Sequence, residues 1–109
     1  MGRHRLGEFE EIVMLTVAIL HGEAYGIAII EEIEKRLNRK VSMGSIQTVL
    51  RRLEKKGFLV SEFGEATKIR GGKRKRFFTV TNLGKETLRQ TRDQRMALWN
   101  AIPKIALDF

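Results

Sequence analysis

The chain has 109 residues, a length that suits one domain or one domain with an appended helix. Its formal charge of +8 indicates an anionic partner, such as a phosphate backbone or an anionic membrane surface, and says nothing of the fold. It has no cysteine, which excludes a disulfide framework and a thiolate metal site.

The first predicted element is a helix over residues 6–20 that ends at Gly22. Its expected inward face comprises Phe9, Ile12, Val13, Val17 and Leu20. The basic start and the apolar run imitate a signal peptide, but acidic residues separate them, no small-residue cleavage site follows, and the run is far shorter than the ~20 residues of a membrane span. We therefore expect a buried core helix in a soluble, cytoplasmic protein with no membrane partner.

A second helix is predicted over residues 27–37, followed by a break at Asn38 and Arg39 and a very short strand at Lys40 and Val41. Its glutamates most simply form a solvated face. The apolar positions expected to face the core are Ile27, Ile30, Ile33 and Leu37.

The third predicted helix runs from Met43 to Lys56, with Ser42 as its N-cap and Gly57 just beyond its end. Its core stripe comprises Ile46, Val49, Leu50 and Leu53. The outward side chains are hydrogen-bond donors and cations, with Glu54 as the single nearby anion. They are Ser45, Gln47, Thr48, Arg51, Arg52 and Lys55.

A hairpin is predicted next, with strands over residues 58–63 and 77–80. The stretch from Lys68 to Arg76 holds six cations, two adjacent glycines and no anion. Charge runs of this kind are often only solvated loops. Between two strands and after an outward-polar helix, however, the run indicates a hairpin that contacts an anionic partner. Arg76 enters the return strand, so we expect part of its role to be structural.

The last predicted helix begins at Leu83, capped by Thr81 or Asn82, and extends toward Ile102, where Pro103 kinks or ends it. It is polar early and apolar late, so its apolar end must pack on its own domain or on a partner. We favour a symmetric dimer, which also matches the twofold symmetry of palindromic operators. The expected interface residues are Leu88, Met96, Trp99 and Ile102.

This order of elements is typical of a winged helix-turn-helix, an α+β, mostly α fold. An exposed helix fits the major groove of B-DNA, and the basic hairpin, or wing, can follow the neighbouring backbone. The third helix is expected to contact DNA through Ser45, Gln47, Thr48, Arg51 and Arg52. The wing is expected to do so through Lys68, Arg70, Lys73, Arg74 and Lys75.

Two segments of the chain resemble PadR-type transcriptional regulators. Residues 41–59, VSMGSIQTVLRRLEKKGFL, resemble the recognition-helix block of that family, and residues 71–84, GGKRKRFFTVTNLG, resemble its wing and the entry to its last helix. Ala24-Tyr25-Gly26 and Leu6-Gly7-Glu8 also fit, so the resemblance covers residues 6–90. With one helix after the wing, the chain is similar to the short subclass of the family, which has a single C-terminal helix.

The resemblance implies a homodimeric DNA-binding regulator, usually a repressor, whose last and first helices form the dimer. It implies a winged-helix DNA-binding domain over residues 1–82 and a dimerisation helix over residues 83–109, within one compact unit. Gln47, Phe77 and Phe78 stand where the family commonly has tyrosine. Glutamine can still read adenine through a bidentate pair, so the departure at Gln47 bears on the operator sequence.

The alternative function is a winged-helix module that docks on a protein partner or on structured RNA, whose A-form major groove excludes a helix. An enzyme is not expected, because the chain shows no nucleophile–histidine constellation and no phosphate-cradling glycine motif. Metal and cofactor sites are not expected either, since the two histidines are far apart and cysteine is absent. The sequence identifies neither a small-molecule effector nor the operator.

Overall fold

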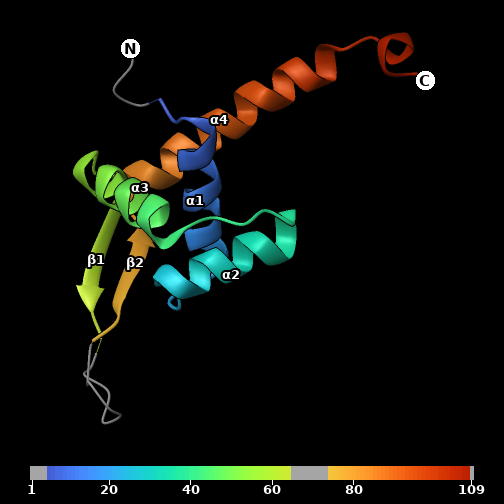
Figure 1. The fold of residues 1–109 in the computed structure, drawn as a ribbon. Helices are drawn as coiled ribbons and strands as arrows, with labels where there is room; N and C mark the ends of the chain where they lie inside the picture. Colours follow the sequence, from blue (N-terminus) through green and yellow to red (C-terminus); the bar gives the residue numbers. More distant parts are fainter. Residues whose placement is uncertain (1–4, 65–73, 109) are drawn as a thin grey trace.

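The computed structural model describes residues 5–64 and 74–108, which form a mostly helical domain with one small antiparallel sheet (Figure 1). This confirms the expected α+β fold class. The elements follow in the order α1 (Glu8–Ile19), α2 (Gly26–Leu37), α3 (Met43–Lys55), β1 (Leu59–Phe63), β2 (Arg76–Val80), α4 (Asn82–Ala101) and the 3-10 turn η2 (Lys104–Leu107).

The core is built around α1, which contacts α2, α3, β2 and α4. Val13, Met14 and Val17 of this helix are buried, while the predicted core residues Phe9, Ile12 and Leu20 are partly buried against the cluster. Met14 lies outside the predicted inward face, yet it is fully buried. A single apolar stripe underestimates the buried arc, because neighbours cover α1 from more than one side.

The prediction for α2 is partly wrong. Ile29 and Ile33 are the buried residues of this helix, whereas Ile27 and Leu37 are 53% and 52% exposed. Leu37 is the last residue of the helix, and Ile27 lines an open cleft between α2 and α3 instead of the core. Ile30 is partly buried against the core.

The prediction for α3 is confirmed in its cap, its core stripe and its C-terminal glycine. The Oγ of Ser42 accepts a hydrogen bond from the backbone N–H of Ser45 at 3.1 Å, as an N-cap does. Gly57 has a φ of 84°, a left-handed conformation that favours glycine. The backbone N–H of Phe58 reaches the carbonyl of Leu53 at 3.0 Å, which closes the helix end. The core stripe is buried as predicted: Ile46, Val49, Leu50 and Leu53.

The short strand predicted at Lys40 and Val41 does not form, and both residues lie in an irregular connection. The place beside β2 is instead taken by the segment before α2, where the carbonyl of Ala24 accepts a hydrogen bond from the N–H of Phe78 at 2.8 Å. On its other side β2 pairs with β1 in antiparallel register, from Leu59 opposite Val80 to Phe63 opposite Arg76. Residues 40–41 therefore lack a strand to pair with.

A buried acid links α1 to α3. Glu10 is only 6% exposed, and its carboxylate accepts hydrogen bonds from the N–H of Gly7 at 2.8 Å and from Nζ of Lys56 at 2.9 Å. Arg52 approaches it at 3.9 Å. Burial alone raises the pKa of the Glu10 carboxyl, but these donors and cations outweigh that effect, so its pKa lies below the ordinary glutamate value.

The long α4 begins against the hairpin and then leaves the body of the domain (Figure 1). Thr81 caps it, since its Oγ1 accepts from the N–H of Gly84 at 3.0 Å. The helix ends at Ala101, as expected from Pro103, and the domain is elongated to 59 × 32 × 21 Å. None of the helices in the described parts of the chain combines the length and apolar character needed to cross a bilayer.

Gly84 is the point of closest approach between α4 and the hairpin. A Cβ at this position would lie 2.3 Å from the carbonyl oxygen of Phe58 and 2.8 Å from Val80. We expect Gly84→Ala to lower the free energy of unfolding by about 1–3 kcal/mol, because the clash outweighs the better helix propensity of alanine. Denaturant titration measures the change.

Gly44 provides the matched control, since it also lies in the first turn of a helix but has open space around its missing Cβ. Gly44→Ala should raise the free energy of unfolding by about 0.5–1 kcal/mol. Equal effects of the two substitutions would show that the close approach at Gly84 has no energetic weight.

The lowered pKa of Glu10 predicts a pH-dependent contribution to stability. Because the folded pKa lies below the unfolded one, the stabilisation is complete above the ordinary glutamate pKa and is lost as the pH falls through the folded value. At pH 7 we expect Glu10→Gln to lower the free energy of unfolding by about 1–3 kcal/mol. The difference from the native chain should narrow below about pH 4.3.

Glu8→Gln is the control for this measurement, because Glu8 lies in the same helical turn but is exposed, with Arg39 at 3.5 Å. Its stability should match that of the native chain at every pH, as for other exposed ion pairs. A difference between Glu10→Gln and the native chain that stays constant down to pH 3 would contradict the assignment.

Candidate nucleic-acid interface

The outward face of α3 carries the predicted base-reading residues. Because the apolar stripe of α3 packs inward, the opposite side of the helix is forced toward solvent. The five predicted residues on α3 are all exposed: Ser45, Gln47, Thr48, Arg51 and Arg52.

These five residues do not all point the same way. Gln47 and Arg51 line an open cleft of about 430 Å³ between α3, the start of α2 and the return strand of the hairpin. Arg52 lies on another side of the helix, where its guanidinium approaches Glu10. Ser45 is close to the N-cap, and its Oγ accepts a hydrogen bond from the hydroxyl of Ser42 at 3.0 Å. The cleft therefore brings together only part of the predicted set.

The predicted wing residues fall into two groups. Lys68, Arg70 and Lys73 lie outside the described residues, whereas Arg74 and Lys75 line the cleft with Gln47 and Arg51. Nε of Arg74 donates a hydrogen bond to the carbonyl of Gly64 at 2.8 Å and so joins the two sides of the hairpin just beyond the paired strands.

Tyr25 joins the cleft from the start of α2. Its ring lies 4.2 Å from Nζ of Lys75 and meets the ring of Phe77 edge-on, with centroids 5.6 Å apart. A cation over an aromatic face is held without being neutralised, so Lys75 keeps its charge for an external anion. The position of Tyr25 before the second helix was visible in the sequence, but its contact with Lys75 depends on the fold.

A second group, on the paired strands of the hairpin, links the wing to α3. The guanidinium of Arg76 lies 5.3 Å from the ring of Phe63, and its Nε donates to Oγ of Ser61 at 2.8 Å. A terminal nitrogen of Arg76 lies 3.4 Å from the carboxylate of Glu54, and Oγ of Ser61 donates to the same carboxylate at 2.6 Å. Arg76 is thus engaged within the protein, as expected from its place in the return strand.

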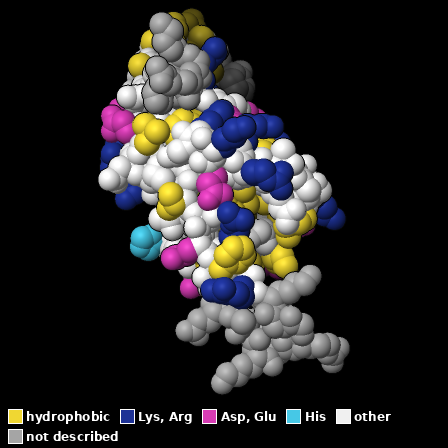
Figure 2. All heavy atoms as spheres, turned by 90° about the vertical axis from the view of Figure 1, so that its left-hand side faces the viewer, with side chains coloured by type: hydrophobic (Ala, Val, Ile, Leu, Met, Phe, Trp, Pro, Cys, Tyr) yellow, Lys and Arg dark blue, Asp and Glu magenta, His cyan; other side chains and the backbone are white. Residues whose placement is uncertain are grey.

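Basic and acidic side chains are mixed on the surface that includes the end of the hairpin (Figure 2). Lysines and arginines spread over much of this face, and acidic side chains lie among them. Among the described residues on this face, the charges are therefore mixed and do not form one uniform cationic patch.

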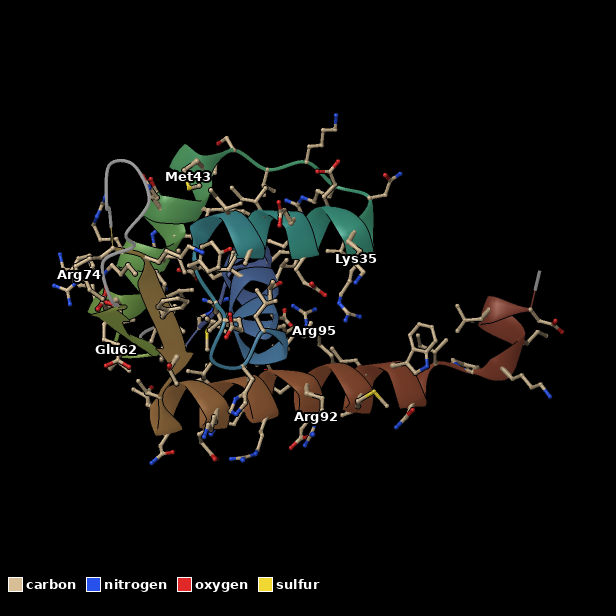
Figure 3. All side chains as sticks on the ribbon, turned by 90° about the horizontal axis from the view of Figure 1, so that it is seen from below. Lys35, Met43, Glu62, Arg74, Arg92 and Arg95 are labelled. Atoms are coloured by element: carbon tan, nitrogen blue, oxygen red, sulfur yellow. The ribbon has the colours of Figure 1, made fainter. Side chains whose placement is uncertain are left out.

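The predicted dimer residues lie along α4. Leu88 is partly buried against the core, while Met96, Trp99 and Ile102 are 48%, 60% and 36% exposed. A second open groove of about 400 Å³ runs between α1 and α4. Figure 3 shows Arg95 reaching from α4 toward α1, where it pairs with Glu11 at 2.8 Å. Arg92 also lines this groove.

Within residues 5–64 and 74–108, no group of three or more histidine, aspartate and glutamate side chains is arranged to hold a metal ion. The arrangement of the cleft instead offers amide, hydroxyl and cationic donors on an exposed helix beside a basic hairpin. Such groups bind phosphates and base edges.

The chain matches known transcriptional regulators in sequence and structure. It is 25% identical to a PadR family transcriptional regulator from Eggerthella lenta DSM 2243, with a TM-score of 0.69 over 94% of this chain and 88% of that one. It is 26% identical to a PadR-like transcription factor from Bacteroides fragilis, with a TM-score of 0.70 over 84% of each chain. A PadR family transcription regulator from Clostridium difficile R20291, 22% identical, shares the fold with a TM-score of 0.66 over 84% of this chain and 92% of that one. Comparison with curated protein sequences gives no match.

Residues 14–90 match the transcriptional regulator PadR-like family. The matched segment includes α2, α3, the hairpin and the first part of α4, so it contains the cleft described above. It confirms the resemblance seen in the recognition-helix and wing segments. Members of this family are transcription regulators and not enzymes. The chain therefore belongs to the PadR-like family of transcriptional regulators.

Proposed function

We propose that this regulator is a cytoplasmic repressor that binds a palindromic operator in duplex DNA as a homodimer. The observation that carries the proposal is the shared cleft, in which Gln47 and Arg51 of the exposed helix α3 stand beside Lys75 of the basic hairpin. Base-reading groups and phosphate-binding groups are thereby presented on one side of the domain.

Within this site we assign sequence reading to α3 and backbone contact to the hairpin. Gln47 suits a bidentate pair with adenine and Arg51 one with guanine, and Ser45 and Thr48 add short polar groups. Arg52, which approaches Glu10, suits a phosphate at the edge of the groove. The hairpin residues assigned to the backbone are Lys68, Arg70, Lys73, Arg74 and Lys75.

The homodimer is supported by the apolar side chains of α4 that the single chain leaves in water. Trp99 is 60% exposed and Leu98 is 73% exposed, and exposed apolar clusters of this kind commonly mark protein interfaces. The groove between α1 and α4 has an apolar floor that includes Leu15, Leu88 and Met96. We assign residues 1–82 to DNA binding and residues 83–109 to dimerisation, with Leu88, Met96, Trp99 and Ile102 at the interface.

The division of labour predicts two kinds of mutant. Gln47→Ala and Arg51→Ala should each reduce the preference for the operator over random duplex by about tenfold, because each removes a base contact. Lys73→Ala combined with Lys75→Ala should weaken binding to all sequences alike and lower the salt dependence by about two counterions. Binding titrations at several salt concentrations, with an operator selected from a random DNA pool, measure both effects.

Lys35→Ala controls for the loss of a lysine as such, because Lys35 lies on α2 far from Arg74 and the hairpin (Figure 3). It should leave affinity and salt dependence close to those of the native protein. A native protein that binds its selected duplex no better than random DNA at about 150 mM salt would refute sequence-specific binding. Stronger competition by duplex RNA would favour the RNA-docking alternative.

The proposed interface predicts that a charge at Trp99 dissociates the dimer. Trp99→Glu should yield a monomer in sedimentation experiments and weaken operator binding at least tenfold, because two linked half-sites bind more tightly than one. Ala97→Glu is the control, since a residue two positions earlier lies on the opposite side of the helix and is exposed there. A dimer that survives Trp99→Glu but not Ala97→Glu would place the interface on the other face of α4.

A further inference from the structure

We infer that Glu54 is a specificity-determining residue, which restrains Arg76 and keeps the domain from binding DNA of any sequence. The inference rests on the proposed DNA-binding function and deepens it. It concerns the group formed by Glu54, Ser61 and Arg76, in which a side chain of α3 contacts both β1 and β2.

Both carboxylate oxygens of Glu54 are engaged within this group. Oε2 accepts the hydroxyl of Ser61 at 2.6 Å, and Oε1 lies 3.4 Å from the guanidinium of Arg76. The guanidinium is further positioned by the rings of Phe63 and Phe78, at 5.3 and 5.9 Å from their centroids. These contacts link the hairpin to α3 and hold the half-exposed side chain of Arg76 against Glu54 and the two rings.

The location of Glu54 makes its negative charge relevant to DNA. It follows Arg51 by one helical turn and lines the same cleft. Among the described residues that line this cleft, Glu54 is the only acid, beside four cations: Arg51, Arg74, Lys75 and Arg76. An anion at this place repels the phosphates of every sequence, so it lowers general affinity.

Specificity depends on the ratio of operator affinity to random-sequence affinity. Without the Glu54 charge, Arg76 keeps its contacts with Ser61 and the two rings but loses its ion pair. Its positive charge is then available to a phosphate in any duplex, which raises random-sequence binding through counterion release. In the operator complex, base contacts by Gln47 and Arg51 already fix the register, and a loosened hairpin fits that register less well. The ratio of operator affinity to random-sequence affinity therefore falls, because the random-sequence affinity rises and the operator affinity decreases.

The test compares Glu54→Gln with Glu62→Gln in the full chain. Glu62 is exposed on β1, opposite Phe77, and its carboxylate pairs with no cation in the described part of the chain. Figure 3 shows it at the outer edge of the hairpin. Each variant removes one negative charge near the wing, but only Glu54→Gln removes the ion pair of Arg76.

We expect Glu54→Gln to raise affinity for random duplex about three- to tenfold at 150 mM salt and to steepen the salt dependence by about one counterion. Affinity for the selected operator should fall by less than about twofold, so specificity falls at least about threefold. Glu62→Gln should raise both affinities about equally and leave their ratio unchanged.

Arg76→Gln provides a second, independent readout, which also serves if Glu54→Gln does not fold. It breaks the same group without creating a free cation, so operator affinity should fall while the salt dependence does not steepen. If the native protein prefers its operator and the two variants Glu54→Gln and Glu62→Gln have equal specificity ratios, the role of Glu54 is refuted and the proposed function still stands. A native protein without operator preference would refute the proposed function itself, and the inference with it.

Discussion

The burial of α1 is the constraint on which the rest of the domain depends. Val13 and Met14 are fully buried, and α2, α3, β2 and α4 all pack against this one helix. Because the apolar side of each neighbouring element packs against the core, the polar side of α3 faces the solvent. The ion pair between Glu10 and Lys56 also joins α1 to the C-terminal end of α3. The exposed polar surface of α3 is thus a consequence of how the interior is filled.

Local signals predicted the recognition helix and its flanks well, because they act over a few residues. A serine cap, a stripe with helical spacing and a glycine in the left-handed conformation each follow from backbone geometry and are found at Ser42, at Ile46 to Leu53 and at Gly57. The core face of α2 was less predictable, since which isoleucines are buried depends on where the neighbouring helices end. Burial of Met14 and Glu10 likewise required the positions of several elements at once.

The candidate site shows the same division. The type of partner followed from charge and order of elements, and the family match supports that interpretation. The pairing of individual charges did not follow, because contacts such as Lys75 with Tyr25 or Arg76 with Glu54 join residues distant in the chain. A count of cations treats Lys75 and Arg76 as equivalent. In the structure, Arg76 pairs with the carboxylate of Glu54, whereas Lys75 lies over the ring of Tyr25.

The close contact at Gly84 holds the first turn of α4 in place, so the helix can tilt about this point. The helix packs at its first turn against the carbonyl of Phe58, and its 20 residues then extend for about 30 Å, with further contacts to α1 and the core through Leu88 and Arg95. Over such an arm, a tilt of about 10° at the first turn displaces the far end by about 5 Å. Conversely, a large displacement of the far end of α4 produces only a small rotation where the helix meets the hairpin. The far end of α4 can therefore change its position while the surface beside Phe58 stays almost still.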